Sequence, residues 1–185
     1  MLTRMRIRMF TQVLRAFAVV LAFLLVCSFA GAVSAAASDP GAAHAARFEL
    51  SDATLWDSSM NLIWPRTLAP AAGPVVWTAA AGFMAQLNKD KYLGHDDWRL
   101  PSREELSALV EYVKGAGFDG SAAGVSLSDG FHAIGLQGIT GDCYWTSSES
   151  WYNQGRAWAV DLSTGNAGIK DKVLTCRVIA VRSMQ

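Results

Sequence analysis

Histidine and cysteine are scarce in this sequence, with three of each in 185 residues. The histidines, His44, His95 and His132, lie far apart, and the sequence has neither an H-E-x-x-H motif nor a paired Cys/His spacing. A G-x-S-x-G motif is also missing, and no nucleophile lies at a recognisable spacing from a base. We therefore expect no metal, no cofactor and no enzymatic activity.

Charged residues are missing from positions 16–38, directly after a segment that holds four arginines in fifteen residues. A basic segment, an apolar segment and a small-residue tail in this order are typical of a secretory signal peptide. We predict a signal peptide over residues 1–35, with cleavage two residues later as the alternative. An uncleaved anchor is a second alternative, because residues 16–33 approach the minimum length of a membrane span. Cleavage predicts a periplasmic, secreted or cell-surface protein without a membrane span.

Positive charge is in short supply after residue 35, where 12 basic residues face 16 acidic ones and the net charge is −4. This balance argues against a nucleic-acid partner. Residues 143–185 hold five basic and three acidic groups, so an anion-attracting patch is expected only there. We predict a flexible, Ala-rich lead-in over residues 36–47 and a single domain over residues 48–185.

Cys143 and Cys176 are the only cysteines after the predicted leader. A lone pair in an oxidising compartment usually forms a disulfide, which we predict here. Two buried free thiols are the alternative.

Hydrophobic patterns and capping signals predict a mixed α+β domain. Residues 48–56 and 61–64 are expected to be strands around a turn, in which Asn61 suits a left-handed conformation. A first helix is predicted from a Thr78 cap to about residue 88, and a second follows the S-x-x-E capping box of Ser102 and Glu105 and ends at Gly115.

The second half of the chain begins with loops over residues 115–142, in which we expect at most a short element. Strands are predicted at residues 143–147, 157–162 and 173–182. In the middle strand, Trp158, Val160 and Leu162 alternate with smaller residues and predict one heavy face. Residues 115–120 spell G-x-G-x-x-G, but they follow a helix end, so they predict helix termination and no dinucleotide site.

Seven tryptophans occur in the chain, and burying an indole stabilises a small domain strongly. A polar loop carries a different group of residues, for which ligand contact and plain loop packing are both open: Trp151, Tyr152, Asn153 and Arg156. The tryptophans expected in the core are Trp56, Trp64, Trp98, Trp145 and Trp158.

Several segments resemble the Legionella collagen-like adhesin C-terminal domain family over about residues 48–183. They are Asp57-x-x-Met60-Asn61-Leu62-x-Trp64, Asp97-Trp98-Arg99-Leu100-Pro101-Ser102-Arg103-Glu104-Glu105-Leu106, Tyr144-Trp145-Thr146-Ser147-Ser148 and Ala157-Trp158-x-Val160. The resemblance implies a C-type-lectin-like fold, shared with formylglycine-generating enzymes, in which two helices pack on twisted antiparallel strands with long loops. In such a fold Trp98 and Leu100 would enter the core, Arg99 would bond backbone or a carboxylate, and Pro101 would precede the capped helix.

The resemblance also implies an exported binding or adhesion module that recognises a glycan or a protein through its loops. The family's adhesin recognises sulfated glycosaminoglycans, whereas the net charge of −4 here favours a neutral glycan or a protein. A sulfated ligand would require five basic residues to converge: Arg156, Lys170, Lys172, Arg177 and Arg182.

Two alternative functions are open, of which only the first follows from the same resemblance. One is an oxidase related to formylglycine-generating enzymes, which use a copper-binding cysteine pair, here Cys143 and Cys176. The other is a structural subunit of the cell envelope, which would form a stable oligomer. Calcium-dependent sugar binding is not expected, because the E-P-N and W-N-D signatures are missing.

Overall fold

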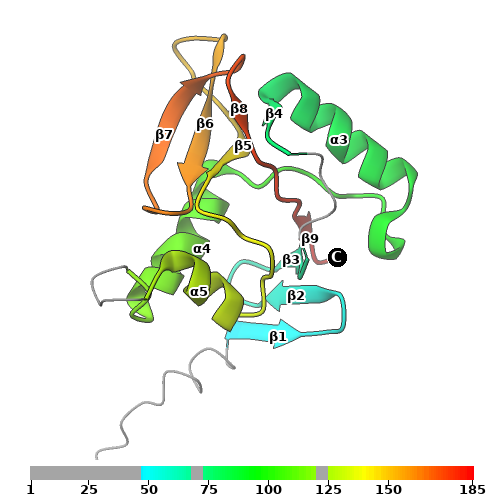
Figure 1. The fold of residues 1–185 in the computed structure, drawn as a ribbon. Coiled ribbons are helices and arrows are strands. Elements are labelled where there is room, and N and C mark those ends of the chain that lie inside the picture. Colours follow the sequence, from blue (N-terminus) through cyan, green and yellow to red (C-terminus); the bar gives the residue numbers. More distant parts are fainter. Residues whose placement is uncertain (1–46, 68–72, 120–124) are drawn as a thin grey trace, which may run out of the picture. The chain divides into compact units, whose positions relative to one another are not determined.

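The computed structural model describes residues 47–67, 73–119 and 125–185, which all belong to one compact unit (Figure 1). The predicted signal peptide and the lead-in up to residue 46 lie outside the described residues. Arg47, at the end of that lead-in, lies over the rings of Phe48 and Tyr112 and forms an ion pair with the buried Asp57. The helices are α3 (Trp77–Lys89), α4 (Arg103–Gly115) and α5 (Leu127–Ala133), with a 3-10 turn at Tyr92–Gly94.

The strands form three antiparallel sheets, in the orders β1-β2-β3-β9, β4-β8 and β5-β6-β7. Their bounds are β1 (Phe48–Leu50), β2 (Thr54–Asp57), β3 (Leu62–Pro65), β4 (Val75–Val76), β5 (Cys143–Glu149), β6 (Arg156–Asp161), β7 (Ala167–Asp171), β8 (Thr175–Cys176) and β9 (Arg182–Ser183). The mixed α+β class is therefore confirmed. The expectation of two helices was wrong, because α5 is a third.

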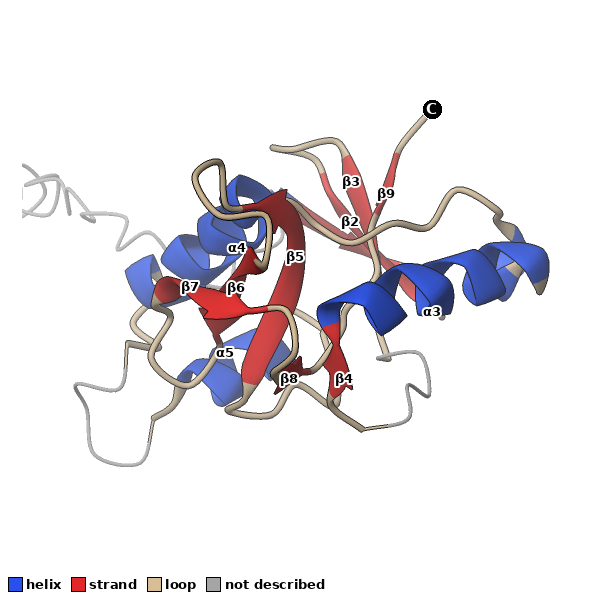
Figure 2. Ribbon diagram, turned by 90° about the horizontal axis from the view of Figure 1, so that it is seen from above, coloured by secondary structure: helices blue, strands red, loops and turns tan. Residues whose placement is uncertain are grey.

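The sheet β5-β6-β7 separates two hydrophobic cores. Figures 1 and 2 show α4 and α5 on one side of this sheet and α3 with the ribbon β4-β8 on the other. Val160 belongs to the core beneath α4, whereas Ala157 and Ala159 belong to the core beneath α3. The predicted heavy face is confirmed, because Val160 and Leu162 lie in the core beneath α4, while the small Ala157 and Ala159 pack on the opposite face, which is also covered.

Two tryptophans expected in the core are only half-buried. Trp158 lies on the same face of β6 as Val160, and the guanidinium of Arg103, at the start of α4, lies 4.5 Å from its ring centroid. Trp56 is also half-buried, although its indole nitrogen is enclosed and has no hydrogen-bond partner among the described residues. Trp64, Trp98 and Trp145 are fully buried.

Helix α4 begins as the sequence predicts. The Ser102 hydroxyl accepts from the Glu105 N–H at 3.1 Å, and the Glu105 carboxylate accepts from the Ser102 N–H at 2.7 Å, which confirms the capping box. Helix α3 differs, because its N-cap is Val76 and no side chain caps it, so the predicted Thr78 cap was wrong. Val76 pairs with Thr175 in the β4-β8 ribbon, and the Trp77 N–H donates to the Lys172 carbonyl, so tertiary contacts set this helix start.

The predicted strand over residues 48–56 is divided by a turn. The Ser51 N–H donates to the Thr54 carbonyl at 2.9 Å, and the Ser51 hydroxyl accepts from the Thr54 N–H at 3.1 Å. Local bonds of this kind compete with the strand ladder. Asn61 adopts φ 55° in the following hairpin, as expected for a left-handed position.

The predicted strand over residues 173–182 was also wrong. The structure has only the two-residue strands β8 and β9 in this stretch, and it has β7 where no strand was predicted. Between β8 and β9 the chain makes single bridges, from Arg177 to Tyr144 and from Val181 to Arg99. Because successive residues of this segment pair with different parts of the chain, their side chains do not alternate between two faces as they do in a regular strand.

Helix α5 is the short element within the predicted loop region. Ser126 and Asp129 form a second capping box at its start. A Cβ atom on Gly130 would lie 2.3 Å from Val113 Cγ1, so only glycine permits this close packing of α5 on α4.

Candidate functional site

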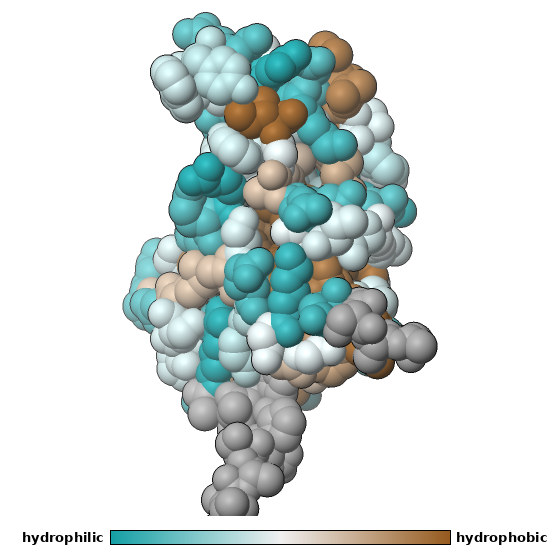
Figure 3. Space-filling model, turned by 90° about the vertical axis from the view of Figure 1, so that its left-hand side faces the viewer, coloured by the Kyte–Doolittle hydropathy of each residue, from teal (hydrophilic) through white to brown (hydrophobic). Residues whose placement is uncertain are grey.

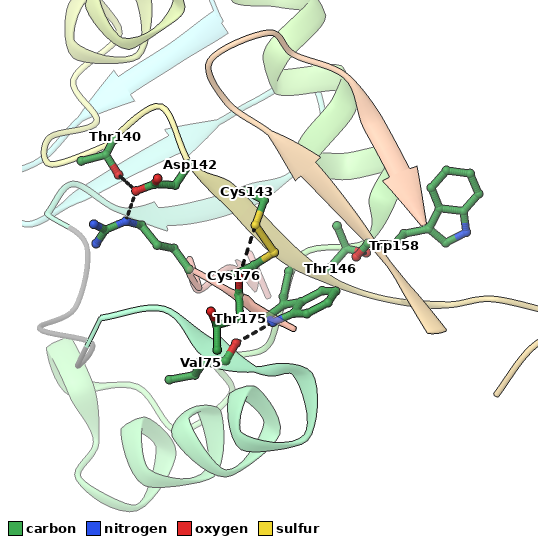
Figure 4. Close-up of a disulfide and its surroundings, with 10 residues drawn as sticks. Val75, Thr140, Asp142, Cys143, Thr146, Trp158, Thr175 and Cys176 are labelled. Atoms are coloured by element: carbon green, nitrogen blue, oxygen red, sulfur yellow. Dashed lines mark hydrogen bonds and ion pairs between the residues drawn. A yellow bond between two sulfur atoms is a disulfide. The ribbon is translucent and has the colours of Figure 1, made fainter. Parts of the chain in front are cut away.

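Cys143 and Cys176 form a disulfide, as predicted, which joins β5 to β8 (Figure 4). Val75 and Thr175 flank it, while Trp158 projects away from it. The Trp145 indole N–H donates to the Val75 carbonyl at 2.8 Å and links β5 to β4, the strand that pairs with β8. Because β8 pairs with β4 over only two residues, the disulfide helps to position the turn that precedes β8.

The D-W-R-L-P block is a structural element. Trp98 is 2 % exposed, and its indole N–H donates to the Tyr92 carbonyl at 2.8 Å. The Asn88 side chain bonds both the N–H and the carbonyl of Trp98. Leu100 is buried beside it. These contacts enclose the indole and leave no part of it for a ligand.

The second half of the block joins α4 to β5. The Arg99 guanidinium bonds both carboxylate oxygens of Glu105 at 2.8 Å. Burial opposes ionisation of Glu105, but bonds from Arg99 and the Ser102 N–H hold its pKa below the ordinary value. The buried Pro101 accepts the Ser147 N–H at its carbonyl at 2.8 Å. The polar groups of this block are therefore used within the fold.

Two connections meet at one end of the sheet β5-β6-β7. The β5–β6 loop covers residues 150–155, and the turn after β7 covers residues 172–174. The Lys172 N–H donates to the Gly155 carbonyl at 2.9 Å, and Arg156 and Asp171 form the adjacent cross-strand pair. Figure 1 shows both connections at the upper end of the sheet.

These connections carry four exposed apolar or aromatic residues, which we call the apolar end: Trp151 at 91 %, Tyr152 at 56 %, Val173 at 81 % and Leu174 at 50 % exposure. They are four of the seven large exposed hydrophobic residues in the described part of the chain. The Trp151 and Tyr152 rings meet edge to face, with centroids 5.3 Å apart. In Figure 3, apolar side chains reach the surface between hydrophilic ones at this upper end. Grouped exposure of this kind marks interaction surfaces.

The sequence indicates the aromatic half of this surface but not the aliphatic half. Val173 and Leu174 lie within the predicted strand over residues 173–182, and their exposure follows from the turn between β7 and β8. The Leu174 N–H donates to the Asp171 carbonyl at 2.9 Å and closes that turn. The short Asp171-Lys172 break before Val173 was the available signal for a turn.

The polar residues predicted for this site differ in their availability. The Asn153 carbonyl oxygen accepts the Gly155 N–H at 2.9 Å and shapes the loop. Arg156 donates to Asp171 at 2.7 Å and is therefore not a free cation. The Tyr152 hydroxyl and the Asn153 amide nitrogen make no hydrogen bond within the described ranges.

The five basic residues considered for a sulfated ligand do not converge as free cations. Four of them have carboxylate partners, in the pairs Arg156–Asp171, Lys172–Glu149, Arg177–Asp142 and Arg182–Asp97. Lys170 lies on the opposite face of β7 from Asp171 and has no ion-pair partner among the described residues.

Two of these pairs have a clear electrostatic effect on their carboxyl groups. Hydrogen bonds from Arg182 and Arg177 lower the pKa of Asp97 and Asp142, respectively, and the bond to Asp142 raises the pKa of Arg177. These carboxylates are therefore held in the ionised form that their partners require.

No group of three or more His, Cys, Asp or Glu side chains in the described ranges is placed to hold a metal ion. No described helix is long and apolar enough to cross a membrane.

Comparison with known proteins gives one positive finding. A family model described as the Lcl C-terminal domain matches residues 53–182, which is well over half of the chain. A search of curated proteins gave no match. The matched segment contains the D-W-R-L-P block, the disulfide and the apolar end, and the chain therefore belongs to the Lcl C-terminal domain family.

Proposed function

We propose that this protein is an exported, non-enzymatic, adhesin-like module that binds a glycan or a protein outside the cytoplasm through its apolar end. The observation that carries the proposal is the exposure of Trp151 and Val173 on two connections held together by a backbone hydrogen bond. Membership of the family supports an adhesin-like role. Aromatic residues of this kind supply large contact areas in binding sites.

We also propose how the protein is exported and which fold its mature domain has. Residues 1–35 would direct export and be removed, and residues 48–185 would form a single C-type-lectin-like domain in the periplasm, in the medium or at the cell surface. The helices on antiparallel sheets and the loops at one sheet end are in keeping with that fold. Oligomers remain compatible with this role.

An oxidase of the formylglycine-generating type is less well supported. Cys143 and Cys176 are bonded to each other, and Cys176 is buried among apolar residues of the core beneath α3. Burial makes Cys176 inert, while Cys143 is only half-buried. The cysteines therefore fit a structural disulfide better than a reactive copper-binding pair.

Binding of the exported protein to immobilised neutral and sulfated glycans tests the proposal, together with photo-cross-linking to cell-surface proteins. Trp151→Ala should lower binding at least about tenfold, as expected for loss of an aromatic anchor. Leu50→Ala is the matched control, because Leu50 is exposed in β1 and outside the apolar end. Failure to bind any glycan or cross-link any protein, or equal loss in both variants, would contradict the proposal.

A further inference from the structure

Carboxylates pair with Arg156 and Lys172, which lie on the two connections that form the apolar end or directly beside them. We propose that this end binds an uncharged polysaccharide, and that Asp171 and Glu149 are specificity-determining residues that exclude sulfated ones. The inference rests on the proposed binding function and adds the class of ligand. Neither acid needs to touch the sugar, because each acts through the cation that it holds.

The β5–β6 loop offers the groups that a neutral sugar requires. Trp151 presents most of its indole surface to solvent, and a flat apolar ring can pack against the C–H face of a sugar ring. The Tyr152 hydroxyl and the Asn153 amide nitrogen remain unused among the described residues and can bond sugar hydroxyls. An apolar platform with a few polar groups is the usual composition of a small-ligand site.

Arg156 is the cation closest in sequence to this loop, and it forms an ion pair with Asp171. The Arg156 Nε donates to Asp171 Oδ1 at 2.7 Å, on neighbouring strands and on the same sheet face. A sulfate that approached Arg156 would therefore meet the Asp171 carboxylate as well. Attraction and repulsion then nearly cancel, so sulfation brings no gain and adds a desolvation cost.

Lys172 is held more firmly than Arg156. Its Nζ lies 2.5 Å from a Glu149 carboxylate oxygen and 4.1 Å from the centroid of the Trp77 ring. Its side chain is only 15 % exposed. Loss of Glu149 would leave the ammonium over the indole, so we expect Asp171 to have the larger effect on charge specificity.

Arg103 extends the same pattern along the face of β6. Its guanidinium stacks on Trp158 and pairs with Glu104 at 2.7 Å. Arg156, Lys172 and Arg103 therefore each have their own acid, whereas Lys170, on the opposite face of β7 from Asp171, has no ion-pair partner among the described residues. On the face that carries Arg156, apolar and aromatic groups are left to recognise the ligand.

The test compares polymers that differ only in sulfation. Dextran, mannan and galactan and their chemically sulfated derivatives are titrated against the full exported protein by affinity electrophoresis. The native protein should bind at least one neutral polymer about fivefold or more tightly than its sulfated form. Asp171→Asn should raise the ratio of sulfated to neutral affinity about fivefold, which is the effect of removing one unit charge about 4 Å from the ligand in water.

Two further variants complete the design. Asp142→Asn frees Arg177 with the same change in net charge, but at the other end of β5, and should leave the affinity ratio unchanged. Trp151→Ala should abolish the gain produced by Asp171→Asn. Because exposed ion pairs add little to stability, Asp171→Asn should still fold, which its thermal unfolding verifies.

A native preference for sulfated polymers, or an unchanged ratio in Asp171→Asn, would overturn the inference. Equal gains in Asp171→Asn and Asp142→Asn would overturn it too, because they would reflect net charge alone. If no polymer binds but a photoreactive group at position 151 cross-links a protein, the inference fails while the proposed binding function stands. If neither occurs, both fail.

Discussion

Trp98 and Trp151 are both followed in the chain by an arginine that forms an ion pair, yet one ring is buried and the other lies in solvent. Arg99 pairs with Glu105 directly after Trp98, and Arg156, five residues after Trp151, pairs with Asp171. The backbone N–H, the carbonyl and the indole nitrogen of Trp98 are all hydrogen-bonded, whereas the Tyr152 hydroxyl and the Asn153 amide nitrogen next to Trp151 make no hydrogen bond among the described residues. An arginine ion pair near a tryptophan therefore does not by itself distinguish a structural segment from a candidate ligand surface.

Trp98→Ala should produce the largest loss of stability, about 3–5 kcal/mol. The substitution would open a cavity in the core beneath α3 and would remove the hydrogen bond from the indole N–H to the Tyr92 carbonyl. Urea denaturation followed by circular dichroism measures the change. A loss below about 1 kcal/mol would show that this block does not support the core.

Removal of the disulfide should be nearly as costly. The double change of Cys143 and Cys176 to Ser should lower the free energy of unfolding by about 3–4 kcal/mol, the chain-entropy expectation for the 33-residue separation. Native protein titrated with reductant and then denatured with urea provides the same comparison without a substitution. Unchanged stability in both experiments would mean that packing alone positions β8.

Acid should weaken the structural segment more than the exposed one. The pKa of Asp97 and of Glu105 is lowered in the folded protein from ordinary values of 3.8 and 4.5. Their stabilising contributions are therefore complete above those values and are lost as pH falls through the lower folded values. The urea midpoint should be flat above about pH 5 and should fall below about pH 4. Arg99→Met should reduce this acid dependence, and an identical profile in that variant would contradict the assignment to Glu105.

Trp151→Ala should have the smallest effect on stability, within about 0.5 kcal/mol. The side chain is almost wholly exposed, so its removal creates no cavity. The same urea experiment as for Trp98→Ala measures it, and binding measurements on the same sample complete the contrast. A stability loss comparable to that of Trp98→Ala would show that the loop is a packing element.

Local signals in the sequence identified several elements because each signal is complete within a few residues. The capping box of Ser102 and Glu105 placed the start of α4, and Asn61 adopted the expected left-handed conformation. The disulfide followed from cysteine count and compartment. Ser126 and Asp129 carry the same type of capping signal, so α5 was also within reach of sequence reasoning.

Other elements could not be predicted because their partners are distant in the chain. Val76 starts α3 through pairing with Thr175, and β7 is a strand because it aligns with β6. The exposure of Val173 likewise depends on where the chain turns between two sheets. Hydrophobic pattern alone cannot distinguish a buried apolar pair from one at the tip of such a turn.

By itself, the sequence determined the family, the mixed α+β class, the cysteine pair and the best-marked helix, because these depend on composition and local hydrogen bonding. Only the tertiary structure places aromatic and aliphatic residues from two connections at one end of a sheet. It also decides that the neighbouring cations form ion pairs with carboxylates. Both arise from contacts between strands that are far apart in the chain. The position of the apolar end and the pairing of the neighbouring cations depend on those contacts, and a local sequence pattern does not predict them.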